Sequence, residues 1–259
     1  MTRVLFIGDV VGGPGRRGLA AAMPELRESH RPDLVIVNGE NSAGGVGITE
    51  KTAQSLFDAG ADVITTGNHV YRHREAYEYL DRAANVVRPA NYPHANPGRG
   101  HLVVEAGGAR IGVINLSGAV GLQVARSPFH EVDGILEQIE ADAILVDFHA
   151  EVTSEKVAMG WHLDGRVAAV FGTHTHVPTA DARVLPKGTA YISDVGMTGS
   201  RTSVLGVKPE QALEALITQM PVRFETAEED VWVMGAAVEI NSAGLAESIR
   251  QVLLPAPPG

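Results

Sequence analysis

Short runs of consecutive apolar residues, each followed by polar residues and then by an amphipathic stretch, dominate the first third of the chain. Buried strands of a parallel sheet have such continuous apolar runs, and the helices that connect them bury one face. Three strand–helix units in succession therefore predict a parallel sheet with helices on its faces. The expected strands are 4–7, 34–37 and 62–66, and the expected helices are 19–29, 49–59 and 73–83.

The middle of the chain has a different pattern. Two runs that flank Gly107-Gly108 predict an antiparallel hairpin over 101–106 and 110–116, and Ser127-Pro128 is typical of a helix start. We expect a loose tail over 254–259, and no repeat or linker divides the chain, so residues 1–259 are predicted to form one domain. The further expected elements are helices 127–139, 154–163 and 211–218, and strands 143–148, 167–171, 189–193 and 231–239.

Polar residues of metal-binding or acid–base type follow five of these strands. In an open α/β sheet the carboxyl ends of the strands lie along one edge, where ligands bind. One Asp or Asn after a strand is typical of a turn, but agreement at five strand ends favours a shared site. The residues are Asp9, Glu40, Asn41, Asn68, His69, His149, His174 and His176.

The number and type of these side chains favour two metal ions over one. Leaving His69 aside, the remaining seven are too many for a single tetrahedral or octahedral ion. Oxygen and nitrogen ligands without sulfur favour Fe, Mn or Zn over Mg or Ca. Two divalent ions would outweigh Asp9 and Glu40 by about two positive charges, which suits a phosphate group.

The amino-acid composition limits the kinds of partner that we expect the protein to bind. The chain carries 21 Lys and Arg against 31 Asp and Glu, a net charge of −10, so nothing indicates binding to a DNA duplex. The absence of cysteine excludes disulfides, thiolate nucleophiles and sulfur-ligated metals. The start of the chain has the pattern of a strand, not of a signal peptide or membrane span, so we expect a cytoplasmic protein. A small-molecule substrate fits this composition, and a homo-oligomer is left open.

The strand-end residues resemble the calcineurin-like metallophosphoesterases, and in particular the YmdB-type branch of bacterial cyclic-nucleotide phosphodiesterases. The chain departs from the wider superfamily in two places: Asp9-Val10-Val11 replaces the usual Asp-x-His, and Glu40 replaces the bridging aspartate. The motifs are Gly8-Asp9, Gly39-Glu40-Asn41, Gly67-Asn68-His69, His149 and Gly172-Thr173-His174-Thr175-His176, and the likeness extends to 194–199.

This resemblance implies an α/β fold, a four-layer αββα sandwich, with a dinuclear metal site at the carboxyl ends of the strands. It also implies iron as the metal and 2′,3′-cyclic nucleotides as substrates. The implied ligands are Asp9, Glu40, Asn41 and His176 for one ion, and Glu40, Asn68, His149 and His174 for the other.

His69 lies beyond the ligand count and is our candidate for the general acid. Metal-bound hydroxide would attack phosphorus in line while His69 protonates the leaving sugar oxygen, a contribution of about 10²–10⁴-fold. The alternative is that His69 only packs or caps.

Three other functions remain open. One is a phosphomonoesterase at the same centre, and another is a non-catalytic, metal-dependent nucleotide sensor. The third is a Rossmann-type dinucleotide-binding enzyme, suggested by the Gly-x-Gly-x-x-Gly pattern over 13–18. This pattern begins several residues after the strand ends, and we expect its glycines to shape the loop that carries Asp9.

Overall fold

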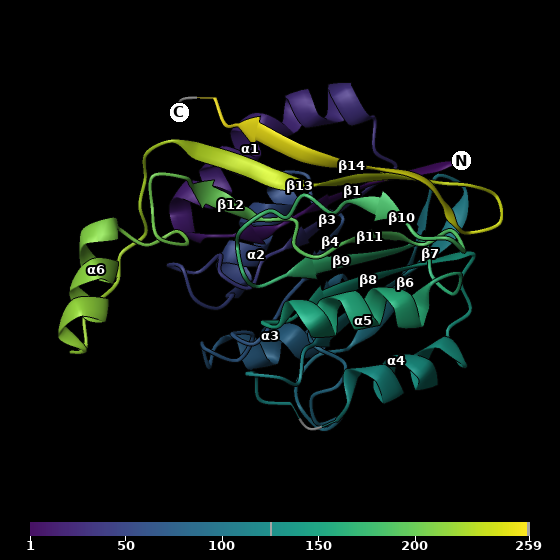
Figure 1. Cartoon of the computed structure of the whole chain (residues 1–259), viewed down its shortest axis with the longest axis horizontal. Helices are drawn as coiled ribbons and strands as arrows, with labels where there is room; N and C mark the ends of the chain where they lie inside the picture. Colours follow the sequence, from purple (N-terminus) through teal and green to yellow (C-terminus); the bar gives the residue numbers. More distant parts are fainter. Residues whose placement is uncertain (125, 258–259) are drawn as a thin grey trace.

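Two β-sheets lie face to face at the centre of the computed structural model, which describes residues 1–124 and 126–257 (Figure 1). In order across the first sheet, the strands are β2 (Asp9–Val10), β12 (Met197–Ser200), β13 (Val231–Ile240), β1 (Thr2–Ile7), β3 (Leu34–Asn38), β4 (Val63–Thr65) and β5 (Val86–Val87), and β14 (Ala246–Pro255) also pairs with β13. The second sheet contains β10 (Arg183–Val184), β11 (Ala190–Ile192), β9 (Ala169–Thr173), β8 (Ala143–His149), β7 (Ala109–Ser117) and β6 (His101–Ala106).

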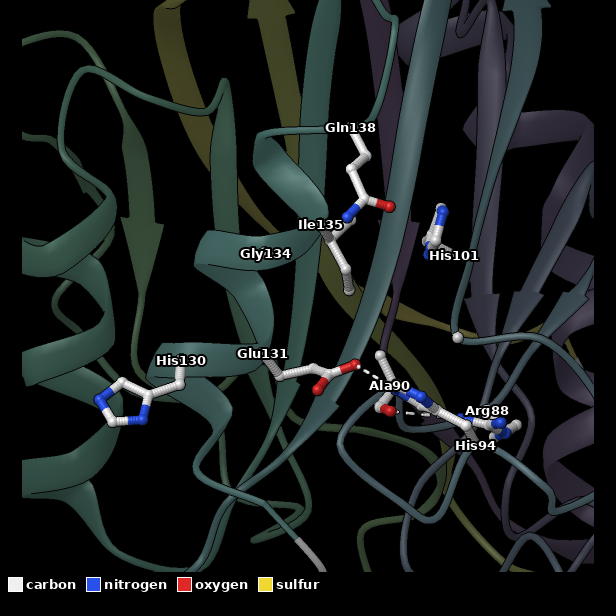
Figure 2. Close-up of a pocket in the computed structure, with 10 residues that line it drawn as sticks. Arg88, Ala90, His94, His101, His130, Glu131, Gly134, Ile135 and Gln138 are labelled. Atoms are coloured by element: carbon white, nitrogen blue, oxygen red, sulfur yellow. Dashed lines mark hydrogen bonds and ion pairs between the residues drawn. The ribbon is translucent and has the colours of Figure 1, made fainter.

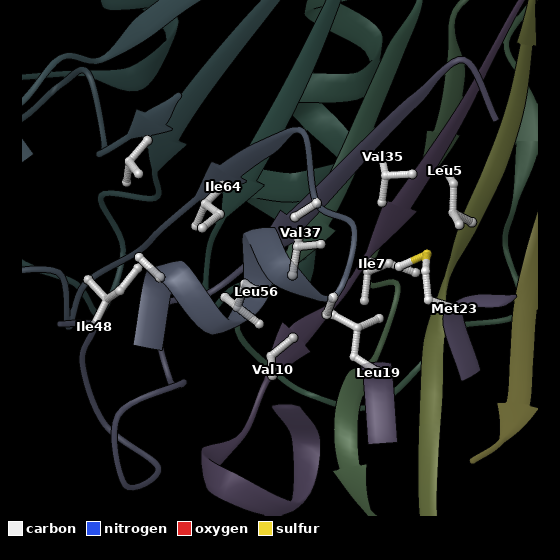
Figure 3. Packing of buried hydrophobic residues seen from close by; sticks show 14 of the residues in the cluster. Leu5, Ile7, Val10, Leu19, Met23, Val35, Val37, Ile48, Leu56 and Ile64 are labelled. Atoms are coloured by element: carbon white, nitrogen blue, oxygen red, sulfur yellow. The ribbon is translucent and has the colours of Figure 1, made fainter. Parts of the chain in front are cut away.

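Strand β1 is buried on both faces, which explains its continuous apolar run. Val4 and Phe6 pack between the two sheets, whereas Leu5 and Ile7 pack towards the helices (Figure 3). Successive side chains of a strand point to opposite faces, so neither face of β1 is left for water. Phe6 stacks on Phe171 of β9 with ring centroids 4.4 Å apart, and this contact joins the sheets.

Helices cover both outer faces and complete the expected four layers. On the first sheet lie α1 (Gly12–His30), α2 (Glu50–Asp58) and α3 (Ala76–Arg82), and on the second lie α4 (Pro128–Leu136) and α5 (Thr153–Leu163). Helix α6 (Pro209–Thr218) stands away from the sheets (Figure 1). The expected fold class is confirmed. None of the helices in the described ranges is long and apolar enough to cross a membrane.

The expected loop around the N-terminal glycines is wrong, because α1 begins at Gly12 and not at residue 19. A Cβ on Gly15 would lie 2.3 Å from the Thr198 carbonyl oxygen, and one on Gly18 would lie 2.5 Å from Val231 Cγ1. These glycines let the helix approach β12 and β13 closely. With no side chains, they also hide the helical periodicity from sequence reasoning.

The expectation of a loose tail over 254–259 is also wrong at residues 254 and 255, which belong to a strand. Strand β14 continues to Pro255 and pairs antiparallel with β13, while residues 258–259 lie outside the described residues. The sequence pattern does not predict β12 and β14, nor the two-residue strands β2, β5 and β10. Strand β12 is only four residues long, and β14 is too unevenly buried to show a clear period of two.

Candidate metal centre and active site

The seven predicted metal ligands lie together at the ends of strands from both sheets. Asp9 begins β2 directly after β1, Glu40 and Asn41 follow β3, and Asn68 follows β4. From the second sheet, His149 ends β8, and His174 and His176 follow β9. The contacts among these side chains form two groups, which are linked by Glu40 and also by Asp9, because Asp9 Oδ1 lies 3.8 Å from His149 Nδ1.

The first group surrounds Nε2 of His149. This nitrogen lies 3.0 Å from Glu40 Oε1, 3.0 Å from Asn68 Oδ1 and 3.1 Å from His174 Nδ1. Ligand atoms of Glu40, His149 and His174 all lie within 4.8 Å of one another, a spacing that could hold one metal ion.

The second group is centred on His176 Nε2, which lies 3.9 Å from Asp9 Oδ1 and 3.1 Å from Asn41 Nδ2. The Asn41 amide nitrogen also lies 3.3 Å from Glu40 Oε1, so Glu40 contacts both groups. Asn41 presents its amide nitrogen to His176, and its side-chain amide would have to rotate for the oxygen to bind a cation.

The three histidines each have one ring nitrogen occupied by an acceptor outside the centre. Thr173 donates its hydroxyl hydrogen to Asp147 at 2.7 Å, so its oxygen accepts from His149 Nδ1 at 2.8 Å. His174 Nε2 faces the carboxylate of Glu151 at 2.8 Å. His176 Nδ1 donates to a backbone carbonyl, that of Leu205, at 3.1 Å. When each ring is neutral and carries its hydrogen on that nitrogen, the other nitrogen has a lone pair that can face the centre, as in metal-binding histidines.

Two further observations fit a metal centre. Asp9 Oδ1 is buried and has no hydrogen-bond partner among the described residues, which is costly unless a cation compensates it. A Cβ on Gly67 would lie 2.3 Å from both Glu40 Oε2 and His149 Nε2, so the space at this position is reserved for the ligand groups. The donor set of carboxylate, amide and imidazole groups suits Fe, Mn or Zn.

The charged groups of the centre shift one another's pKa values. Burial raises the pKa of Asp9. Burial would also raise the pKa of Glu40, but His149 lowers it to about 2; conversely, burial would lower the pKa of His149, but Glu40 and Asp9 raise it to about 9. Burial and the neighbouring His149 lower the pKa of His174 to about 4. Positive charge beside Asp9 and Glu40 would stabilise both buried carboxylates as anions, and divalent cations can supply it.

A buried ion pair anchors the loop that carries two of the histidines. His174 and His176 have φ of 93° and 65°, a region that non-glycine residues rarely adopt. Between them, the backbone N–H and hydroxyl of Thr175 donate to Asp194 Oδ2 at 3.1 and 2.7 Å. Lys156 on α5 pairs with the same oxygen at 2.7 Å. The ion pair therefore holds the backbone that directs both imidazoles.

His69, the candidate general acid, lies at the partly exposed edge of the centre. Its backbone N–H donates to Glu40 Oε2 at 3.1 Å, and its ring Nε2 lies 3.4 Å from Asn68 Nδ2. The ring is thus next to a predicted ligand but is not in either group.

Sequence reasoning missed the residues that orient the histidines. Asp147 could have been noticed, because it is a carboxylate within an apolar strand, and burial raises its pKa to about 7. Glu151 lies only two residues after His149 and had a weaker signal. The carbonyl of Leu205 had none, since any residue carries a backbone carbonyl.

Known proteins match this chain over nearly its whole length. The model of a family described as YmdB-like protein matches residues 5–252. A protein of Bacillus subtilis (strain 168) named 2′,3′-cyclic-nucleotide 2′-phosphodiesterase is 47% identical over 241 residues, which cover 92% of this chain and 91% of that protein.

Two solved structures share the fold. A hypothetical protein from Thermus thermophilus is 41% identical, with a TM-score of 0.94 over 99% of this chain and all of that one. A structure described as a novel phosphatase from Mycoplasma pneumoniae is 34% identical, with a TM-score of 0.91 over 99% of this chain and 95% of that one.

Proposed function

This chain belongs to the YmdB-like protein family, and on that basis we propose that it is a phosphodiesterase that hydrolyses 2′,3′-cyclic nucleotides with the help of two metal ions. The observation that carries the proposal is the convergence of seven oxygen and nitrogen donors in two groups that share Glu40. Such a donor set suits metal-assisted phosphoester hydrolysis. The Bacillus subtilis relative is named for a reaction of this kind, which supports a phosphoester substrate.

The proposed ligand sets are the two groups of the structure. Asp9, Asn41 and His176 would hold one ion, Asn68, His149 and His174 the other, and Glu40 both. Iron is the proposed metal, with manganese and zinc as alternatives for the same donors. When bound, such a pair lowers the pKa of a water nucleophile and neutralises the charge of the phosphoryl oxygens.

The protein's own residues arrange the rest of the reaction. Thr173, Glu151 and the carbonyl of Leu205 fix the orientation of the three imidazoles. Water adds to phosphorus, the bond to the ribose 2′ oxygen breaks, and His69 gives that oxygen its proton. Breakage at the 2′ oxygen follows the name of the Bacillus subtilis relative.

A phosphomonoesterase is the second candidate, because the Mycoplasma pneumoniae structure is described as a phosphatase. The two functions differ in the charge of the substrate: a monoester dianion needs more positive charge at the site than a diester monoanion. Turnover of bis-p-nitrophenyl phosphate against p-nitrophenyl phosphate separates them, since the diesterase must prefer the first.

The decisive experiment combines elemental analysis with a substrate panel. The purified protein should contain about two transition-metal ions per chain and should convert 2′,3′-cyclic nucleotides to 3′-nucleotides. Loss of turnover on chelation, with recovery on adding iron or manganese, is the expected control. Tight nucleotide binding without turnover in any metal would overturn the proposal and favour a sensor.

A further inference from the structure

An open cavity of about 600 Å³ adjoins the candidate metal centre, and Asn68 forms part of its wall. The same Asn68 side chain contacts His149, so the cavity begins where the first ligand group ends. Tyr71, Tyr92 and Asn96 line it together with the segment 121–124. None of its lining residues in the described part of the chain carries a charge.

The contrast between centre and cavity indicates the kind of ligand that fits both. With the proposed metal ions bound, the centre suits an anionic group, whereas the cavity offers uncharged amide, aromatic and aliphatic side chains. A ligand that spans them has one charged end and one neutral, partly aromatic end. A second phosphate would find no cation in the cavity, which argues against an oligonucleotide or a dinucleotide.

The two tyrosines form a stacking surface, not a clamp. Their ring centroids are 6.1 Å apart and their planes are inclined by 34°. A third ring between them would need about 3.5 Å on each side, roughly 7 Å in all, and nearly parallel walls. Tyr92 is only 8% exposed, so the partly exposed Tyr71 supplies the accessible face.

Tyr71 is held in place without any help from a ligand. Its hydroxyl donates to the Pro97 carbonyl at 2.7 Å, and the Tyr77 ring meets it edge-on with centroids 5.6 Å apart. A rigid aromatic surface loses little entropy when a base stacks on it, and such stacking is tolerant of base identity.

The loop that carries Tyr92 is also held in place, by contacts on the side away from the cavity that adjoins the centre. There Arg88, only 4% exposed, donates to the Pro89 carbonyl at 2.8 Å and to the Ala90 carbonyl at 3.4 Å. Figure 2 shows Arg88 beside Ala90. The cavity of about 370 Å³ on that side is lined by charged groups, including Arg88 and Glu131, and by none of the predicted metal ligands. The two cavities therefore differ in chemistry, and only the uncharged one reaches the centre.

We propose that the uncharged cavity binds the nucleobase of a mononucleotide substrate and that Tyr71 is the residue on which the base stacks. This assignment rests on the proposed function for the identity of the substrate. It adds that affinity for the nucleoside portion lies in Tyr71 and the neighbouring amides, apart from the groups that hold the phosphate.

Two cyclic phosphates and three variants test the assignment. The substrates are 2′,3′-cyclic AMP and methyl β-D-ribofuranoside 2,3-cyclic phosphate, which has the same phosphoester and ribose but no base. Tyr71→Leu should raise KM for cyclic AMP about 10-fold, in line with base–aromatic stacking, at nearly unchanged kcat. It should leave the base-free substrate unaffected. Tyr71→Phe loses the hydrogen bond to the Pro97 carbonyl but keeps the ring and its edge-on contact with Tyr77, so it should raise KM for cyclic AMP far less than Tyr71→Leu.

The matched control is Tyr79→Leu, which removes a partly buried ring of α3 that packs against the same core cluster but does not line the cavity. It should leave the ratio of the two KM values unchanged. Equal effects of Tyr71→Leu on both substrates, or an effect no larger than that of Tyr79→Leu, would overturn the assignment.

A binding readout separates this inference from the proposed function. Adenosine contains base and ribose but no phosphate, and saturation-transfer NMR should detect its contact with the protein through the base protons. Tyr71→Leu should abolish that signal, and an undiminished signal overturns the assignment. Should the protein hydrolyse neither cyclic phosphate, the proposed function fails, and the adenosine result alone decides whether the cavity binds a nucleobase.

Discussion

Replacing Lys156 with methionine should destabilise the fold by about 3–5 kcal/mol, the usual result of removing one partner of a buried ion pair. Lys156 and Asp194 are 3% and 1% exposed and lie 2.7 Å apart. Methionine fills a similar volume but leaves the Asp194 carboxylate without a counter-ion in a site that water does not reach. Hydrogen bonds from Thr175 remain, yet they cannot replace the lost charge.

The loss can be measured by urea unfolding followed through tryptophan fluorescence, with a chelator present so that metal binding does not contribute. For a chain of this size, 3–5 kcal/mol corresponds to a fall in Tm of roughly 6–20 °C. The double variant Lys156→Met/Asp194→Asn removes both charges and should recover most of the loss. Lys208→Met breaks the exposed pair with Glu225 and should leave the unfolding midpoint within error.

A loss of no more than about 1 kcal/mol for Lys156→Met would refute this prediction, since an uncompensated buried charge would then cost no more than an average substitution. A double variant no more stable than the single one would refute it equally. In that case the effect would come from packing, and not from the ion pair.

Three further predictions concern the centre and its surroundings. His69→Ala should keep both metals by elemental analysis but lose about 10²–10⁴-fold in kcat, and a near-normal rate would refute its role as general acid. His174→Ala should lose metal in the same analysis; full metal content would remove it from the ligand set. Partial burial would raise the pKa of Asp181, but hydrogen bonds from Ser193 and Thr179 lower it below its ordinary 3.8. The stability that Asp181 contributes is therefore present above pH 3.8 and is lost as the pH falls through the lower folded-state value. Acid titration of Tm should show a steeper loss for the unmodified protein than for Asp181→Asn, and parallel curves would contradict this.

The fold could be predicted from the sequence wherever the apolar and polar side chains of a segment are enough to determine its secondary structure. Strand β1 shows a buried run because Val4 and Leu5 face different cores, and Thr49 caps α2 through its hydroxyl, a role typical of Thr at the start of a helix. The start of α1 was lost because Gly15 and Gly18 have no side chain whose periodicity could be seen. Their role is set by the backbone of β12 and the side chain of Val231, which lie far along the chain.

The candidate centre, too, could be predicted only where it depends on side-chain type. Asp9, Glu40 and His149 could be proposed from the sequence because each follows an apolar run with a ligand-type side chain. Their common location depends on two sheets meeting, which the resemblance implied and the strand pattern alone did not. The Leu205 carbonyl could not have been found, because backbone groups are the same at every position.

The origin of the donors in both sheets has a consequence for how the protein matures. Asp9, Glu40 and Asn68 come from the N-terminal part of the chain, whereas the histidines come from beyond its midpoint. Neither portion carries the full set of proposed ligands, so the complete centre can form only after most of the polypeptide has left the ribosome. With the proposed metal binding, an ion at about a hundred times its Kd would add about 2.7 kcal/mol to the stability of the folded state. It would link the two portions of the chain only after both have been made.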